Sequence, residues 1–272
     1  MIDFDNIDTI PNSIIALINK KRELIRSELL LDIKRTLAGH QWKGGTVSIE
    51  NYNKLLKIVI DLLKNEKILG FHCTKHINPR ELLKTGLNKL NPREYEIWMK
   101  KFLKSKLNDE KTIKEIDNCF AKFNEHNEYK HRENMIWFLI NRSLVHDSGC
   151  KYFFKYYGGE VIKRLAYPIK DTVFPILIQT GIPTVVEFEF EFKELTVYHQ
   201  HNLVNSLIKS KIFEKSYTYY NEMQTEGYVT RDIKPQDIVE VYFDSDITRL
   251  KNIVISSKLP SKSGFGASLT GN

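Results

Sequence analysis

The chain of 272 residues is long enough to bury a substantial core, and its composition of 42% hydrophobic and 28% charged residues excludes wholesale disorder. Lysine and arginine number 41 against 34 aspartates and glutamates, and the net charge of +7 favours a polyanionic partner without identifying it. The start of the chain is acidic and polar, and no apolar run reaches the length of a membrane span, so we expect a cytoplasmic protein with no membrane partner.

The chain contains three cysteines, Cys73, Cys119 and Cys150. They are few and far apart, and the sequence contains no CxxC motif. This pattern argues against a disulfide framework and fits a reducing compartment.

Residues 1–66 are predicted to form a helical extension. Apolar side chains recur at helical spacing from Pro11 to Leu37, with lysines and arginines between them, which predicts an amphipathic helix. A glycine-rich turn follows, but it lacks the Lys-Ser/Thr ending of a P-loop, and no strand precedes it. Ser48 or Asn51 then opens a second helix.

The stretch from Ile68 to Thr74 organises the rest of the chain. Its apolar residues suit a strand, and Asn78, Pro79 and Gly86 then supply the start and stop signals of one short helix. The pattern predicts a strand that carries His72 to its tip, where a ligand can reach the titratable ring. The alternative is a structural histidine that is hydrogen-bonded at a strand end.

Two helices are predicted to be inserted between residues 91 and 132, where apolar residues are spaced for one helix face. The segment is also rich in lysine, at Lys100, Lys101, Lys104, Lys106, Lys111 and Lys114. These lysines form either a basic surface for a polyanion or a solvated helix face, which is the more common arrangement.

A second group of motifs begins with Met135 to Ile140, a continuous apolar run that predicts a buried strand. After a polar turn, the aromatic-rich residues 152–157 precede Gly158-Gly159-Glu160 and a further helix. The glycine pair allows close approach of the backbone, and the aromatic rings can either form a stacking wall or pack in the core.

Residues 184–192 end in strict alternation of acidic and aromatic side chains. Alternate residues of a strand face opposite sides, so the phenylalanines should face the core and the glutamates the solvent. The phenylalanines are Phe188, Phe190 and Phe192, and the glutamates are Glu187, Glu189 and Glu191. A solvated strand face is favoured over a metal site for these three carboxylates.

The last predicted strands begin at Glu226 and continue, after a turn at Lys234-Pro235, through residues 238–243. Residues 256–272 are rich in serine, lysine and glycine, and they are predicted to form a flexible tail. No internal repeat or low-complexity tract is present.

Three of these segments, in this order, resemble those of ADP-ribosyltransferases of the bacterial toxin and phage-defence type. His72-Cys73-Thr74, with the helix end Gly86-Leu87, resembles the first nicotinamide-riboside-binding segment. Tyr157-Gly158-Gly159-Glu160 resembles the second segment. Glu226, followed by an Ile-x-Pro-x-x-Ile-x-x-Val pattern, resembles the segment with the catalytic glutamate. The resemblance covers residues 67–245, and Cys73 departs from the small or aromatic residue that is commoner at its position.

The resemblance implies an α+β fold, namely the split β-sandwich of two small sheets that binds NAD in a cleft. Residues 67–255 would form this catalytic domain with its helical insertion at 91–132, after the N-terminal extension 1–66 and before the tail 256–272. The alternation of helical and strand segments agrees with the α+β class.

The resemblance also implies how NAD would be bound. His72 would hold the ribose of the adenosine half, Thr74 would position the nicotinamide side, and Tyr156 or Tyr157 would stack on the nicotinamide. Glu160 would be a structural carboxylate at a helix start, where the helix dipole favours negative charge.

Glu226 would be the catalytic residue, with Glu222 as the alternative, although an ordinary surface role stays open for either. The reaction would break the bond between nicotinamide and ribose through a transition state with oxocarbenium character. Such a cation needs a nearby carboxylate and a fixed sugar, so NAD is expected as co-substrate and no metal is required.

The implied function is that of an NAD-dependent mono-ADP-ribosyltransferase, a toxin or phage-defence effector that modifies RNA or DNA, with an antitoxin protein as a further partner. A protein side chain is the alternative acceptor. Two other classes stay open. One is a metal-dependent nuclease or hydrolase that uses His72, Cys73 and His76, and the other is a noncatalytic basic nucleic-acid-binding protein.

Overall fold

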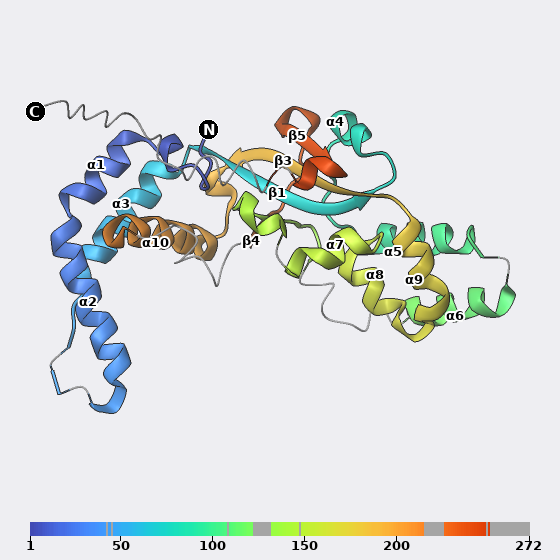
Figure 1. The fold of residues 1–272 in the computed structure, drawn as a ribbon, viewed down its shortest axis with the longest axis horizontal. Helices are drawn as coiled ribbons and strands as arrows, with labels where there is room; N and C mark the ends of the chain where they lie inside the picture. The colour runs from blue at the N-terminus through green and yellow to red at the C-terminus, as the bar shows by residue number, and fades with distance from the viewer. Residues whose placement is uncertain are drawn as a thin grey trace, which may run out of the picture.

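The computed structural model describes residues 1–250 except Trp42, Gly45, Asn108, 122–131, Asp147, 215–225 and Arg249. The chain has an α+β fold, as predicted, and the described residues form one antiparallel sheet of five strands in the order β4-β2-β1-β3-β5 (Figure 1). The strands are β1 (Lys67–His76), β2 (Ile136–Leu139), β3 (Ile182–Glu191), β4 (Glu226–Val229) and β5 (Ile238–Phe243). The predicted tail at 256–272 and Glu222 lie outside the described residues.

The first helices lie at one end of the sheet, together with a later helix that packs against them (Figure 1). They are η1 (Ile7–Thr9), α1 (Asn12–Lys20), α2 (Arg22–Ala38), η2 (Gly39–Gln41), α3 (Glu50–Leu63) and α10 (Val197–Phe213). Their buried side chains form one continuous hydrophobic core with Ile68, Phe138 and Phe188 of the sheet. The N-terminal helices and the strands are therefore held together by a shared core.

Two boundaries of these helices differ from the prediction. The single helix expected between Pro11 and Leu37 is divided at Lys21, whose φ of −102° and ψ of 5° are not helical. The next helix begins at Glu50 rather than at Ser48 or Asn51. Its first amides donate to Glu28 of α2, over 3.4 Å from Asn51 and 2.9 Å from Tyr52. The carboxylate that satisfies this helix start thus comes from a neighbouring helix, which a local sequence signal does not reveal.

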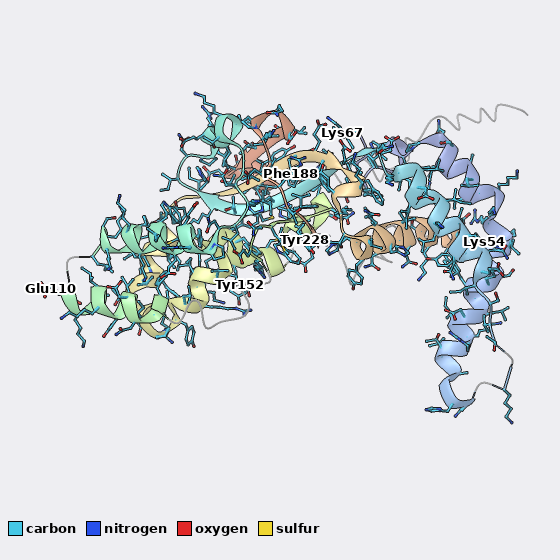
Figure 2. The ribbon with its side chains drawn as sticks, turned by 180° about the vertical axis from the view of Figure 1, so that it is seen from behind. Lys54, Lys67, Glu110, Tyr152, Phe188 and Tyr228 are labelled. Carbon is cyan, nitrogen blue, oxygen red and sulfur yellow. The ribbon has the colours of Figure 1, made fainter. Side chains whose placement is uncertain are left out.

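Helices α5 to α9 lie toward the opposite end of the sheet (Figure 1). The helices that follow β1, apart from α10, are η3 (Pro79–Glu81), α4 (Leu82–Thr85), α5 (Pro92–Lys104), α6 (Glu110–Ala121), η5 (Arg142–His146), η6 (Ser148–Cys150), α7 (Lys151–Lys155), α8 (Gly159–Leu165), η7 (Tyr167–Ile169), α9 (Lys170–Gln179), η8 (Phe192–Glu194) and η9 (Pro235–Asp237). The pair α5 and α6 is the predicted helical insertion, and it shares a second core with α8 and α9. Figure 2 shows this arrangement from behind, with Glu110 and Lys54 at opposite ends of the molecule and Phe188 in the sheet between them.

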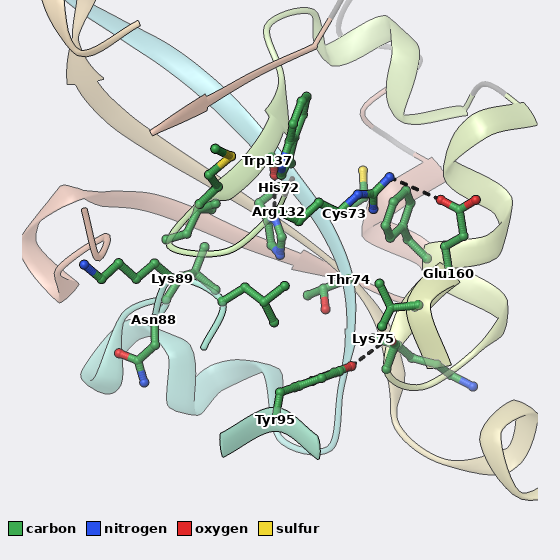
Figure 3. A pocket seen from close by; sticks show the side chains of 18 of the residues that line it. His72, Cys73, Thr74, Lys75, Asn88, Lys89, Tyr95, Arg132, Trp137 and Glu160 are labelled. Carbon is green, nitrogen blue, oxygen red and sulfur yellow. Dashed lines mark hydrogen bonds and ion pairs between the residues drawn. The ribbon is translucent and has the colours of Figure 1, made fainter. Parts of the chain in front are cut away.

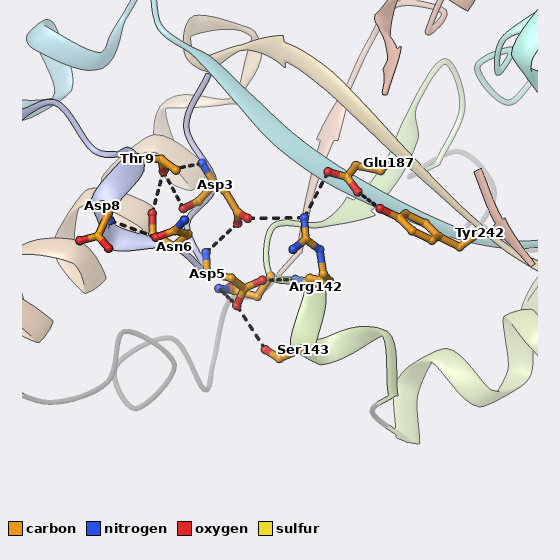
Figure 4. Close-up of polar contacts among 10 residues, drawn as sticks. Asp3, Asp5, Asn6, Asp8, Thr9, Arg142, Ser143, Glu187 and Tyr242 are labelled. Atoms are coloured by element: carbon orange, nitrogen blue, oxygen red, sulfur yellow. Dashed lines mark hydrogen bonds and ion pairs between the residues drawn. The ribbon is translucent and has the colours of Figure 1, made fainter. Parts of the chain in front are cut away.

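The prediction that Glu187 faces solvent was wrong. This carboxylate is buried, accepts from the Tyr242 hydroxyl over 2.6 Å and lies 3.2 Å from Arg142 (Figure 4). The η5 segment after β2 covers the face of the sheet on which Glu187 lies. Its Arg142 also lies 3.5 Å from Asp3 at the start of the chain. Leu69 and Val185 belong to a third core on the same face, so both faces of the central strands are buried.

Candidate functional site

The candidate site is a pocket between β1 and β2. Strand β1 pairs with β3 along its whole length, from Lys67 to His76. With β2, its paired residues are Phe71 and Leu139. Beyond that pair a pocket of about 500 Å³ opens beside both strands (Figure 3). Pockets of about 300–1,000 Å³ hold drug-sized ligands, so this one can take a large part of a dinucleotide.

His72 lies where the two strands separate. Its ring nitrogen Nδ1 is 2.7 Å from the backbone oxygen of Trp137. Because a carbonyl oxygen only accepts, Nδ1 carries the proton, and in the neutral ring Nε2 is left as an acceptor on the side that faces the pocket (Figure 3). Burial lowers the pKa of His72, against the smaller opposite effect of the Trp137 carbonyl, so the ring is neutral at pH 7.

Thr74 also lines the pocket, two residues further along β1. Between them, Cys73 has its thiol against that of Cys150, and this hydrogen bond together with burial raises the pKa of the Cys73 thiol. Cys73 therefore remains a protonated thiol at neutral pH. Within the described ranges, no group of three His, Cys, Asp or Glu side chains could hold a metal ion.

The two candidate tyrosines occupy different places. Tyr157 lines the pocket, with its ring edge-on to Trp98 at a centroid distance of 5.4 Å. Burial raises the pKa of Tyr157 to about 12, so its hydroxyl is protonated. Tyr156 is absent from the described pocket wall and packs on Phe174 with ring centroids 5.0 Å apart. Of the two rings, only Tyr157 is therefore placed to contact a ligand.

Gly158 brings the backbone close to the inserted helix α5. It has a φ of +87°, and its carbonyl oxygen accepts from the Tyr95 hydroxyl over 2.7 Å. A Cβ at this position would lie 2.6 Å from Met99 and 2.9 Å from the Tyr95 hydroxyl. The glycine is required both by its conformation and by this contact, which joins two walls of the pocket.

Charged side chains are paired at the rim of the pocket. Arg132 lies 3.4 Å from Glu160 (Figure 3), and Glu160 is also 2.6 Å from Arg164. The Arg132 guanidinium is 6.0 Å from the centroid of the Trp137 ring. Glu160, at the start of α8, therefore neutralises part of the positive charge here, as a structural carboxylate would.

Glu226 is not among the described residues that line the pocket. It is exposed at the first position of β4, opposite Leu139, which in turn pairs with Phe71 of β1. Tyr228, two residues on, faces the same side as Glu226, and its ring lies 4.9 Å from the Trp137 ring. Trp137, on β2, lines the pocket. Glu226 lies on β4, the strand that pairs with β2 on the side away from β1.

His199 is a neighbour of Glu226 that the sequence analysis missed. It lies in the first turn of α10, where its Nδ1 is 2.9 Å from the Thr196 hydroxyl, and its ring is edge-on to Tyr228 at 5.3 Å. Burial lowers the pKa of His199, while the negative charge of Glu226 opposes that shift. The one sequence signal was the helix cap Thr196, and it gives no reason to expect a neighbour on β4.

The structure thus brings His72, Thr74 and Tyr157 to one pocket, places Tyr156 in the core and leaves Glu226 on the strand beside Trp137. No helix in the described part of the chain has both the length and the apolar character needed to cross a bilayer. Comparisons with protein-family models, with curated proteins and with solved structures found no match.

Proposed function

We propose that the protein is an NAD-dependent ADP-ribosyltransferase that binds the nicotinamide and ribose end of NAD in the pocket between β1 and β2. The observation that carries the proposal is the opening beside these strands, which places His72, Thr74 and Tyr157 around a cavity of about 500 Å³. Glu226 begins the next strand on the far side of β2. The strand order β4-β2-β1 places Glu226 and His72 on strands either side of β2. By the register, Glu226 lies with Leu139 and Phe71 on the face of the sheet opposite to that of His72.

Each of the pocket residues has a chemistry suited to its role. Neutral His72 presents Nε2 as an acceptor for a ribose hydroxyl, and the Thr74 hydroxyl can donate or accept. Tyr157 is a rigid aromatic ring that can pack against nicotinamide. These contacts would fix the sugar while the glycosidic bond breaks.

Glu226 would supply the negative charge that the reaction needs. When the C–N bond breaks, nicotinamide leaves with the electron pair, and the ribose carbon becomes an oxocarbenium-like cation that a carboxylate stabilises. The acceptor then donates an electron pair to that carbon and loses a proton, which Glu226 can accept. The exposed position of Glu226 leaves it accessible to an acceptor.

The finer fold assignment is part of the same proposal. In a split sandwich, the ligand enters where neighbouring strands part, and the short register between β1 and β2 is consistent with such a split. The described strands belong to one sheet, so the split would lie within this sheet.

The proposed acceptor is RNA or DNA, in keeping with the net charge of +7 and a toxin or phage-defence role in the cytoplasm, where an antitoxin would control the enzyme. Transfer to a protein side chain is the alternative. On the insertion, Lys100 pairs with Glu96 and Lys104 with Asp117, both over 2.8 Å, so these two lysines add little to a basic binding surface.

The proposal is tested by incubating the protein with NAD labelled in its adenylate half and measuring released nicotinamide and the label in RNA, DNA and protein fractions. Glu226→Gln keeps the size of the side chain and removes its charge, so turnover should fall by at least about 100-fold. Glu81→Gln, an exposed carboxylate on η3, is the matched control and should retain full activity. Absence of nicotinamide release from the parent protein with every acceptor would overturn the proposal.

A further inference from the structure

The inserted helix α5 carries a row of aromatic rings beside the pocket, and two of them, Tyr95 and Trp98, line it. Tyr95, Trp98 and Phe102 are spaced so that they share one helix face, and we call them the aromatic strip. The ring centroids of Tyr95 and Trp98 are 5.6 Å apart, and those of Trp98 and Phe102 are 6.3 Å apart. Trp98 lines the pocket, yet 43% of its surface is exposed. A ring that is both in the pocket wall and open to solvent can stack on a ligand that enters from outside.

Contacts with Tyr157 and Gly158 hold the aromatic strip in place. Tyr157 lies edge-on to Trp98 at 5.4 Å and to Phe102 at 5.2 Å, and the Tyr95 hydroxyl donates to the Gly158 carbonyl. At the start of α5, the Asn91 side chain accepts from the Glu94 amide over 3.3 Å. The exposed face of Trp98 is therefore presented by a fixed support, which reduces the entropy that binding would cost.

Lysine side chains lie beside the aromatic strip, on α5 and on the segments next to it. Lys101 is exposed one helical turn beyond Trp98, and Lys106 places its Nζ 5.9 Å from the centroid of the Phe102 ring. Lys89 lines the pocket from the segment before α5. Glu94 also lines the pocket, whereas Glu160 is engaged by Arg132 and Arg164. Aromatic rings interleaved with cations are the usual composition of surfaces that bind single-stranded nucleic acid.

We propose that the acceptor is a single-stranded nucleic acid and that one of its unpaired bases stacks on Trp98 next to the bound NAD. This inference rests on the proposed function and adds to it the strandedness of the acceptor and the residue that holds it. The bases of a duplex are stacked on one another, so only an unpaired base can place its face on a ring at a pocket mouth. The phosphates on either side of that base would meet Lys101 and Lys106.

A guanidinium group of a protein acceptor could also stack on Trp98, since arginine binds aromatic faces. The cations beside the strip disfavour that occupant, because Lys89, Lys101 and Lys106 would repel a second positive charge. The adenine of NAD is a third candidate for the same ring. The three occupants predict different kinetic results when Trp98 is changed.

The experiment compares the parent protein with Trp98→Ala, Trp98→Phe and Ile97→Ala. Ile97 is the adjacent residue on α5, 59% exposed and outside the described pocket wall, so Ile97→Ala is the matched control for the loss of an exposed apolar side chain. Three quantities are measured: hydrolysis of NAD in water, transfer of labelled ADP-ribose to a single-stranded RNA, its DNA counterpart and the matching duplexes, and binding of the fluorescein-labelled single strands. Circular dichroism checks that each variant is folded.

We expect transfer to and binding of single strands to fall by about 5- to 150-fold in Trp98→Ala, the effect of losing one stacked base, and less in Trp98→Phe. The change in the KM for NAD in the hydrolysis assay should be smaller than the loss of transfer and of single-strand binding, and Ile97→Ala should change none of the three quantities. Equal loss of hydrolysis and transfer, with a raised KM for NAD, would place adenine on Trp98 and overturn the inference. Label that goes to protein, or to duplexes as readily as to single strands, would overturn it as well.

The binding arm separates this inference from the proposed function. If the parent cleaves NAD and binds single strands with no dependence on Trp98, the inference is wrong while the enzyme proposal stands. If the parent never cleaves NAD but binds single strands only when Trp98 is present, the enzyme proposal is wrong, and Trp98 remains a base-stacking platform.

Discussion

The Nδ1 atom of His72 lies 2.7 Å from the carbonyl oxygen of Trp137, so a side chain of β1 bonds the backbone of β2 where the pocket opens. In a regular antiparallel pair, that carbonyl would accept from the backbone of the adjoining strand. The imidazole satisfies the carbonyl while the pocket opens between the strands. His72 is thus a structural bond and a candidate ligand contact at once, through its two different ring nitrogens.

The first prediction concerns the pH dependence that His72 contributes. Burial lowers the pKa of the folded histidine below its unfolded value of about 6.5, so the folded state binds the proton less well. The associated stability is complete above the unfolded pKa and falls as the pH decreases through the folded pKa. In His72→Asn, the melting temperature should be lower at pH 7 and should decline less between pH 7 and pH 5 than in the parent. Parallel curves for the two proteins would contradict this assignment.

A second prediction concerns Gly158, where φ is +87° and a Cβ would lie 2.6 Å from Met99. Gly158→Ala should cost roughly 1–3 kcal/mol of unfolding free energy, because the side chain is strained there and displaces the α5 contact. Nicotinamide release should fall with it. Gly149→Ala is the control, since a Cβ on that exposed glycine meets no described atom within 4 Å. Chemical denaturation measures both variants, and equal effects would show that the contact is unimportant.

Local signals in the sequence were enough to predict the elements around the pocket. The apolar run before His72 does form part of β1, but the strand continues to His76, so His72 lies within it and not at its tip as predicted. The helix that follows ends at Gly86, which has the positive φ of 75° that favours glycine. The inserted helices followed in the same way from periodicity, and the alternation of helical and strand segments agreed with the α+β class that the resemblance implied. Each of these features depends on residues that are close together in the chain.

Contacts between distant segments could not be predicted in this way. The burial of Glu187 depends on Arg142 and Tyr242, and alternation along β3 does not show that another segment covers its acidic face. Which of Tyr156 and Tyr157 lines the pocket depends on where α5 packs. The position of His199 beside Glu226 likewise depends on how α10 meets the edge strand β4, which no local pattern specifies.

The third prediction compares two glutamates of β3 that are two residues apart. Glu187→Gln removes the charge that lies 3.2 Å from the buried Arg142 guanidinium, whose remaining carboxylate partner Asp3 is 3.5 Å away. The loss should be about 3 kcal/mol, because the arginine stays buried with less compensation. Glu189→Gln breaks an ion pair with the exposed Lys67 and should have a much smaller effect. Urea unfolding of both variants provides the comparison, and a similar loss in the two would argue against a buried network.

The last prediction concerns Lys75, whose side chain connects β1 to the helices α7 and α9 next to Tyr157. Its ammonium group donates to the carbonyl oxygens of Leu177 over 3.3 Å and Lys155 over 3.4 Å, and also to that of Ile178. These carbonyls lie near the ends of α9 and α7, where the helix dipole favours a positive charge. Lys75→Met keeps the length and apolar stem of the side chain but leaves the carbonyls without this donor.

We therefore expect Lys75→Met to lower the unfolding free energy by roughly 1–3 kcal/mol, because three backbone carbonyls lose hydrogen bonds from a charged donor. Hydrogen exchange should increase in α9 and at the Tyr157 amide, which donates to the Leu177 carbonyl over 3.0 Å. Lys84→Met, on the exposed side of α4, is the control and should change neither quantity. Unchanged exchange at Tyr157 in Lys75→Met would show that the lysine does not connect the two walls of the pocket, even if the protein were less stable.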